Sequence, residues 1–300
     1  MLTYDLFILG ASGFVGSTVV EAALSAGLSV GAWARTEAQA NALRQRGVAV
    51  CAPSSIPRSK VVIDLIQPKL PDRLGEGAFE KAARYRVETT REVLQALPAE
   101  SLLFSVSGTD DFVRGTISHH SPFLAADEAK GFARIGLSVR REVLASKRRF
   151  ASIHLGTVYG PGKAFASKLF PGLAKGRIPI IGAGTNRLPL IHVEDAARAL
   201  VHLATLGTER VTAHPWIVTD GTETTQRDLL ERAAELLGGP KPKSVPRWLA
   251  SLIAGSVAAG AFSRDLPTDP SALLACGFTF RFPSIATGLP ASIAQLKAAV

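Results

Sequence analysis

The fold is decided by one stretch near the start of the chain, Leu6-Phe7-Ile8-Leu9-Gly10-Ala11-Ser12-Gly13-Phe14-Val15-Gly16. Its first four residues form an apolar run of strand length, and its glycines lead into a helical pattern that ends at Gly27. Glycines let the backbone turn tightly and approach a pyrophosphate, and free N–H groups at a helix start attract the anion. This order therefore predicts a dinucleotide-binding unit. A tight turn without a ligand is the alternative.

The second expected strand, 28–34, ends in Arg35 and Thr36, and Thr36 with Gln39 matches a capping box. An acidic side chain at this strand end binds the ribose 2′-hydroxyl of NAD, whereas an arginine accommodates the 2′-phosphate of NADP. We therefore expect NADP(H) to be favoured over NAD(H); a solvated surface arginine is the alternative. The residues expected to bind the cofactor are Gly10, Ser12, Gly13, Phe14, Val15, Gly16, Arg35, Thr36, Leu65 and Ser105.

Composition and charge favour a globular protein that acts on a small molecule. The 300 residues are 47% hydrophobic and carry a net charge of +9, but the cations are scattered, so no nucleic-acid partner is expected. Cys51 and Cys276 match no metal spacing and are interpreted as core residues, so no metal is expected. The apolar stretch 248–262 is too short to cross a bilayer and is interpreted as lobe core or a homodimer contact. Without a signal-peptide pattern, a cytoplasmic location is expected.

Strands and helices alternate along the first half of the chain. Such alternation predicts an α/β fold with a Rossmann-type, doubly wound parallel sheet that binds its ligand at the carboxyl ends of the strands. A smaller C-terminal α/β lobe is expected to bind the substrate. The expected division is 1–158 with 188–206 for the Rossmann domain, and 159–187 with 207–300 for the lobe.

Five segments follow one another in a characteristic order: Gly10–Gly16, Phe104–Ser107, Val158–Gly162, Ile191–Ala197, and Gly277-Phe278 followed by Gly288-Leu289. Together they resemble the extended short-chain dehydrogenase/reductase superfamily, which includes nucleotide-sugar epimerases and dehydratases. The resemblance covers nearly the whole chain and implies the Rossmann fold and a nicotinamide cofactor.

The resemblance also implies a catalytic serine or threonine, a tyrosine, and a lysine four residues after the tyrosine. Ser107 matches the serine. With Glu142 as the anchor of the expected helix, Arg134 occupies the tyrosine position and Ser138 the lysine position. The chain is therefore interpreted as an atypical member without the tyrosine–lysine pair.

A literal Tyr-x-x-x-Lys does occur at Tyr159 and Lys163, but it spans the Gly160-Pro161-Gly162 turn, which excludes a regular helical face. Arginine stays protonated, so Arg134 cannot transfer a proton as tyrosine does, although it can bind an anion or polarise a carbonyl.

Other candidates lie in loops. Asp110, Asp111, His119 and His120 follow Ser107, and His120 is a speculative proton donor because imidazole titrates near neutrality. Solvated loop residues are the alternative. His154 stands where the family commonly has an arginine. Asn186 and Arg187 are candidate substrate-binding residues, Arg187 for a phosphate or carboxylate.

Three functions are compatible with these observations. The first is an NADP(H)-dependent oxidoreductase with a non-standard active site, acting on a small polar or anionic carbonyl or hydroxyl substrate. The second is a non-catalytic regulatory protein that senses NADP(H). The third is a nucleotide-sugar epimerase or dehydratase, against which the missing tyrosine argues.

Overall fold

The structure is a computed structural model that describes residues 3–52, 55–71, 75–162, 169–254, 260 and 262–298. Its centre is a seven-stranded parallel sheet in the order β10-β6-β5-β4-β1-β2-β3. The predicted Rossmann-type α/β fold is confirmed. The strands are β1 (Tyr4–Leu9), β2 (Val30–Trp33), β3 (Ala49–Cys51), β4 (Ser59–Asp64), β5 (Leu102–Gly108), β6 (Phe150–Leu155) and β10 (Trp216–Val218).

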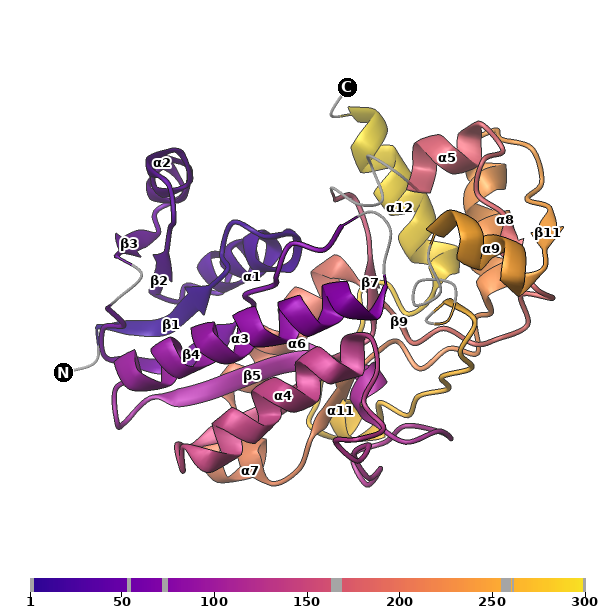
Figure 1. The fold of residues 1–300 in the computed structure, drawn as a ribbon. Helices are drawn as coiled ribbons and strands as arrows, with labels where there is room; N and C mark the ends of the chain where they lie inside the picture. Colours follow the sequence, from indigo (N-terminus) through magenta and orange to yellow (C-terminus); the bar gives the residue numbers. More distant parts are fainter. Residues whose placement is uncertain are drawn as a thin grey trace.

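Helices cover both faces of the sheet. In Figure 1, α3 (Glu76–Ala96) and α4 (Phe132–Ala145) pass in front of it, and α1 (Phe14–Ser25) packs with α6 (Val193–Thr205) on the other face. The middle residues of the strands are largely apolar because a parallel sheet covered on both faces has no side exposed to water. Phe7, Ile8, Ile63 and Phe104 are fully buried.

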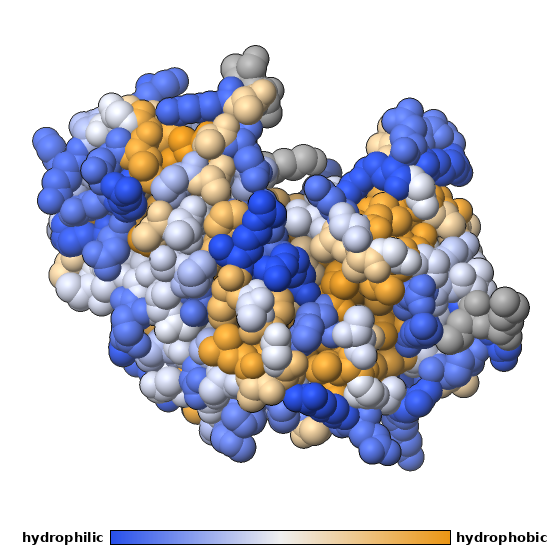
Figure 2. Space-filling model, turned by 180° about the vertical axis from the view of Figure 1, so that it is seen from behind, coloured by the Kyte–Doolittle hydropathy of each residue, from blue (hydrophilic) through white to orange (hydrophobic). Residues whose placement is uncertain are grey.

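A smaller lobe lies beyond the carboxyl ends of β1 and β5 (Figure 1). It has its own apolar core, which includes Tyr159, Leu230 and Leu289. Seen from behind in Figure 2, a notch separates this lobe from the end of the molecule that carries α2. Beside the central sheet, α2 (Glu37–Gln45) lies between β2 and β3 along the chain. The other elements not yet given are β7 (Thr157–Tyr159), α5 (Phe170–Ala174), β8 (Ile180–Ile181), β9 (Leu190–His192), α8 (Gln226–Leu236), β11 (Ser244–Val245), α9 (Arg247–Ala254) and α12 (Ile285–Ala298).

The expected division of the chain changes in one respect. Residues after 207 were assigned to the smaller lobe, but β10 extends the central sheet by pairing with β6. The helices α7 (Thr208–Thr212) and α11 (Ser271–Ala275) accompany it, and Trp216 and Leu273 join the main core. These segments return to the Rossmann domain because the last strand and its neighbouring helix bury their apolar side chains there.

Two sequence expectations fall partly outside the described residues. Of the helix expected over 163–174 the structure describes only α5, and Lys163 is not among the described residues. Of the apolar stretch 248–262 it describes the part in α9, with Gly260 and Phe262. Among the described helices, none is both long and apolar enough to cross a membrane.

A buried carboxylate joins α6 to the chain before α12. Asp195, which is fully buried, accepts hydrogen bonds from the backbone N–H of Arg281 (2.8 Å) and of Phe282 (2.7 Å). The Arg198 guanidinium donates a third bond, at 2.8 Å. One buried side chain therefore links α6 to the segment that leads into α12.

Replacing Asp195 with alanine is expected to lower the free energy of unfolding by about 3 kcal/mol, because the two backbone donors would remain buried without their partner. Urea unfolding followed by circular dichroism measures this change. Glu194→Ala, one residue away and partly exposed beside Arg281, is the matched control and is expected to cost less than about 1 kcal/mol. Equal losses for the two variants would contradict the argument.

Asp220 follows β10 and is a second buried carboxylate. Its Oδ1 accepts hydrogen bonds from the N–H and hydroxyl of Thr222, whereas its Oδ2 is buried with no hydrogen-bond partner in the described part of the chain. Burial raises the pKa of Asp220 to about 6, an effect that the bonds from Thr222 oppose. The folded protein therefore holds this proton more strongly than the unfolded chain does.

A raised carboxyl pKa stabilises the fold at low pH, and this contribution is lost as the pH rises from about 4 through about 6. Asp220→Asn removes the ionisation, so its stability relative to the unmodified protein should be greater at pH 8 than at pH 4, by about 2 kcal/mol. Urea midpoints at the two pH values test this. The same relative stability at both would show that Asp220 does not titrate as its burial indicates.

Candidate cofactor and active site

The glycine turn is built by close backbone approaches. Gly10 has φ +81°, and a side chain there would lie 2.7 Å from the carbonyl oxygen of Leu65. A side chain on Gly16 would overlap the carbonyl oxygen of Gly10. Gly13 is the N-cap of α1 and donates its N–H to Gly10 (2.9 Å). The sequence-predicted turn is therefore formed, and glycine is sterically required at Gly10 and Gly16.

This turn fits a dinucleotide phosphate. Ser12 and Gly13 are exposed, and the first turn of α1 contains no acidic residue that would repel an anion. The N-cap makes no side-chain hydrogen bond to the helix, so the first N–H groups of α1 are available to a ligand. Gly162 packs against the ring of Phe14, which brings the chain after β7 over the start of this helix.

Arg35 lies just beyond β2, where it is exposed. Thr36 caps α2 by accepting a hydrogen bond from the N–H of Gln39 (3.3 Å), and the Gln39 side chain accepts one from the N–H of Arg35 (3.2 Å). The Thr36 half of the expected capping box is confirmed, whereas the Gln39 side chain binds the N–H of Arg35 instead of that of Thr36 and so fixes the backbone of Arg35. Within the described ranges no carboxylate forms an ion pair with this guanidinium, so its charge is available to a phosphate.

The loop after β4 completes the cofactor edge. Leu65 donates its N–H to Leu9 (3.0 Å), and Asp64 at the end of β4 lies beside Ser105 on β5. Asp64 and Arg86 form an ion pair of 2.8 Å in which both side chains are 3% exposed. This pair ties α3 to the strand end, so Leu65 and Ser105 lie at the edge next to the glycine turn.

Ser107 is on β5 and lies against α4 at Gly136. A side chain at Gly136 would overlap the Ser107 hydroxyl and the Asp111 carboxylate. Residues of a helix are about 100° apart, so Arg134 and Ser138, each two residues from Gly136, point about 200° away from it. Neither therefore faces Ser107, in contrast to the sequence prediction.

Arg134 instead contacts α3. Its guanidinium donates to Glu80 at 2.8 Å and lies 4.0 Å from Glu76. The helix register inferred from Glu142 led to the earlier expectation, but Glu142 also faces α3, where it pairs with Arg91 at 2.8 Å. Packing against β5 determines which face of α4 points toward Ser107. The position of Glu142 in the sequence carries no information about that packing.

Asp111, His154 and Arg140 surround the inner side of Ser107. The His154 Nδ1 lies 3.4 Å from Asp111 Oδ2, and both side chains are 2% exposed. His154 is also the cross-strand neighbour of Ser107. The Arg140 guanidinium lies 3.8 Å from the centre of the Phe123 ring. Burial lowers the pKa of Arg140, and the charge of Asp111 opposes that change.

Asp110 connects this cluster to the C-terminal part of the chain. It pairs with Arg264 at 2.7 Å. Burial raises the pKa of Asp110, the Arg264 guanidinium opposes this, and the neighbouring Asp111 adds to it. The residues after Ser107 thus place one carboxylate inward and one toward the segment before α11.

The chain's three tyrosines lie elsewhere. Tyr4 is on β1 and Tyr85 is exposed on α3. Tyr159 is fully buried in the smaller lobe, where its hydroxyl donates to the Ser284 carbonyl at 3.3 Å. Burial raises the pKa of Tyr159 above its ordinary value. The interpretation of Tyr159 as a residue of the strand-end turn, outside any helix, agrees with this position.

His120 belongs to a different cluster from the one around Ser107. Its ring centre lies 3.8 Å from that of His119, which lies 4.8 Å from that of His214, two residues before β10. Burial and the neighbouring histidines lower the pKa of His119. His120 as a proton donor remains a prediction, but the histidine beside Ser107 is His154.

Asn186 and Arg187 hold the segment before α11. The Asn186 amide donates to the carbonyls of Phe262 (2.9 Å) and Arg264 (3.1 Å). Arg187 pairs with Asp265 at 2.6 Å and with Glu223 at 2.7 Å. These hydrogen bonds raise the pKa of Arg187. Two carboxylates already neutralise its charge, so the structure uses both predicted substrate residues as a clamp.

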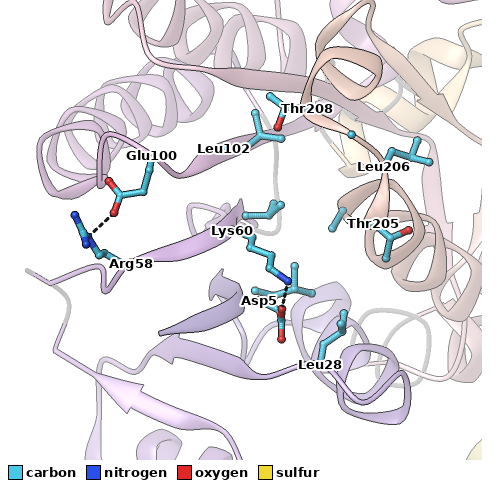
Figure 3. Close-up of a pocket in the computed structure, with 13 residues that line it drawn as sticks. Asp5, Leu28, Arg58, Lys60, Glu100, Leu102, Thr205, Leu206 and Thr208 are labelled. Atoms are coloured by element: carbon cyan, nitrogen blue, oxygen red, sulfur yellow. Dashed lines mark hydrogen bonds and ion pairs between the residues drawn. The ribbon is translucent and has the colours of Figure 1, made fainter. Parts of the chain in front are cut away.

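A groove of about 880 Å³ lies at the opposite edge of the sheet (Figure 3). It is lined by the amino ends of β1, β4 and β5 and by the chain after α6. Its charges are paired, Lys60 with Asp5 at 2.6 Å and Arg58 with Glu100 at 2.5 Å. Hydrogen bonds from Lys60 and Ser29 lower the pKa of Asp5 to about 2. Because it lies at the amino ends of the strands, the groove is separate from the carboxyl ends, where the cofactor is expected to bind.

Sequence reasoning missed Gly136 and Arg140. Gly136 had a detectable signal, since a glycine inside an amphipathic helix commonly has a packing reason. Arg140 is one turn after Gly136 and so shares its face, but this becomes visible only once Gly136 is recognised as the contact with Ser107.

Comparisons with known proteins agree with the observed fold. Residues 131–217 match the NAD dependent epimerase/dehydratase family. A 3-diazoavenalumate denitrifying reductase from Streptomyces sp. is 26% identical over 276 residues, which cover 83% of this chain and 87% of that protein.

Two solved structures can be superposed on 98% of this chain, over 99% of their own length. Human epimerase family protein SDR39U1 with NADPH has a TM-score of 0.78 at 18% identity. UDP-glucuronic acid 4-epimerase from Bacillus cereus, in complex with UDP-glucuronic acid and NAD, has a TM-score of 0.74 at 17% identity. With its glycine turn and seven-stranded parallel sheet, the chain shares the fold of these two proteins, and the family match covers its residues 131–217.

Proposed function

We propose that this protein is an NADP(H)-dependent reductase whose active site is centred on Ser107. The observation that carries the proposal is the placement of Ser107 at the same sheet edge as the glycine turn, with its hydroxyl against Gly136 instead of beside a tyrosine. The similarity to a reductase and the fold shared with an NADPH complex support it.

The chain's own residues suit a nicotinamide dinucleotide. Gly10, Gly13 and the start of α1 would hold the pyrophosphate, and Arg35 would pair with a 2′-phosphate. When bound, the cofactor supplies a hydride. A guanidinium that pairs with a phosphate through charged hydrogen bonds contributes about 1.5–3 kcal/mol, enough to distinguish NADPH from NADH.

Ser107 would donate a hydrogen bond to the substrate oxygen and so orient and polarise a carbonyl group. Arg140 would supply a fixed positive charge on the same side of α4. That charge favours electron density that accumulates on the substrate oxygen as the carbonyl is reduced. The substrate class that fits is therefore a carbonyl compound, and a polar or anionic one remains our expectation.

Cofactor preference is tested by calorimetric titration with NADPH and with NADH. Arg35→Asp is expected to weaken NADPH binding by 10- to 100-fold, about 1.4–2.7 kcal/mol, and to leave NADH binding unchanged or stronger. Arg44→Asp, the same charge change within α2, is the control and should alter neither affinity by more than about twofold. An unchanged affinity for NADPH in Arg35→Asp would contradict the proposed preference for NADP(H).

Catalysis is tested by following NADPH oxidation over a panel of aldehydes and ketones. Ser107→Ala is expected to reduce kcat by about 100-fold, since one oxyanion-stabilising donor contributes that much. Arg140→Met is expected to reduce kcat at least tenfold, whereas Arg134→Met should leave it within about twofold because Arg134 faces α3. A larger loss of kcat for Arg134→Met than for Arg140→Met would instead support the helix register inferred from the sequence.

Tight NADPH binding without turnover on any carbonyl would favour the NADP(H)-sensing alternative. Inversion of one sugar carbon of a nucleotide sugar, without net consumption of NADPH, would favour the epimerase alternative.

A further inference from the structure

We propose that Asp111 and His154 hold the proton that the reduction requires and deliver it through the Ser107 hydroxyl. This inference rests on the proposed reductase function and names its proton source. A family member without a tyrosine beside its serine needs another group for this step, because reducing a carbonyl to an alcohol consumes one proton.

The Asp111 carboxylate is buried in an unusual state. It is 1% exposed, and its Oδ2 lacks a hydrogen-bond partner among the described residues. An isolated buried carboxylate is costly, so such groups are normally paired or serve a function. The charged or ionisable groups near it are Arg140, Asp110 and His154, and His154 is the nearest at 3.4 Å.

His154 is fixed beside Asp111, with its Nδ1–H donated to the Gly108 carbonyl. Its Nδ1 lies 3.1 Å from the Gly108 carbonyl as well as near Asp111, and its Nε2 lies 2.9 Å from the Ser152 hydroxyl. Phe112 and Phe123 pack against the ring, with centres 4.6 and 5.4 Å away. The imidazole is thus fixed in one orientation and shielded from water.

Gly136 brings the pair to Ser107. The Ser107 hydroxyl and both Asp111 carboxylate oxygens surround the place where a Gly136 side chain would begin. Any larger residue would separate the hydroxyl from the carboxylate. The glycine therefore permits a path from His154 through Asp111 to Ser107 along the end of β5.

The step balances as follows. The carbonyl carbon would receive the hydride that a bound reduced nicotinamide supplies, and the π electron pair would move to the oxygen. That oxygen would take the Ser107 hydroxyl proton, and Ser107 would take a proton held by the Asp111–His154 pair. After the alcohol leaves, solvent would return a proton to Ser107 and through it to the pair. Asp111 and His154 do not touch the substrate, so they are positioning residues that act through Ser107.

The test uses Asp111→Asn, which keeps the size of the side chain but cannot supply a carboxyl proton. With the best substrate of the carbonyl panel, kcat is expected to fall at least 100-fold while KM and NADPH affinity stay within about threefold. The solvent deuterium isotope effect on kcat should rise, because proton delivery becomes slower. Asp110→Asn is the matched control for the same charge change and should keep kcat within about fivefold.

A second measurement needs no substrate. In NMR spectra of the whole protein, the His154 Nδ1–H should give a downfield signal protected from exchange. This signal should shift upfield in Asp111→Asn, where the Gly108 carbonyl remains its acceptor, and stay in place in Asp110→Asn. If Asp111→Asn does not fold, His154→Gln is expected to reproduce the kcat loss with unchanged NADPH affinity.

Failure of the inference differs from failure of the proposed function. Turnover that Ser107→Ala abolishes but Asp111→Asn and His154→Gln leave intact would overturn the proton path and keep the reductase. A rise in KM with kcat unchanged would also overturn it, since that indicates a binding role. Absence of turnover on every carbonyl would remove the reductase itself.

Discussion

The close approach of the glycine turn to the loop after β4 is the constraint on which the cofactor edge depends. Gly10 lies so near the Leu65 carbonyl, and Gly16 so near the Gly10 carbonyl, that no side chain fits at either position. The buried Asp64–Arg86 pair holds the facing loop in place. Two backbone segments and one ion pair thus fix the end of the sheet that would receive a pyrophosphate, before any ligand contributes.

The proposed active site around Ser107 depends on a similar contact one strand further along. Gly136 lets α4 approach β5 closely, and the space that a side chain would fill is taken by the Ser107 hydroxyl and the Asp111 carboxylate. Polar groups that close together are expensive to bury unless they serve one another or a substrate. The same glycine also explains why Arg140, one turn later, is the α4 arginine on this side.

The cofactor half of the site could be predicted from sequence because its determinants are local. The glycine turn, the Thr36 cap and the strand-end position of Ser107 each depend on a few consecutive residues. The α4 face and the roles of Asn186 and Arg187 depend on partners far away in sequence; Arg187 pairs with Asp265, 78 positions later. A cation without a visible partner in sequence is easily interpreted as a ligand site, and here the fold supplies the partner.

The contrast between Arg35 and Arg187 shows what makes an arginine available to a ligand. Both follow strand-end or loop sequences that suggest anion binding, yet Arg187 is held by two carboxylates, whereas the contact that the described residues make with Arg35 is to its backbone N–H. A guanidinium already paired with two acids would have to break those bonds before binding a phosphate. The charge that can select a 2′-phosphate is therefore the one whose backbone is ordered while its side chain remains free.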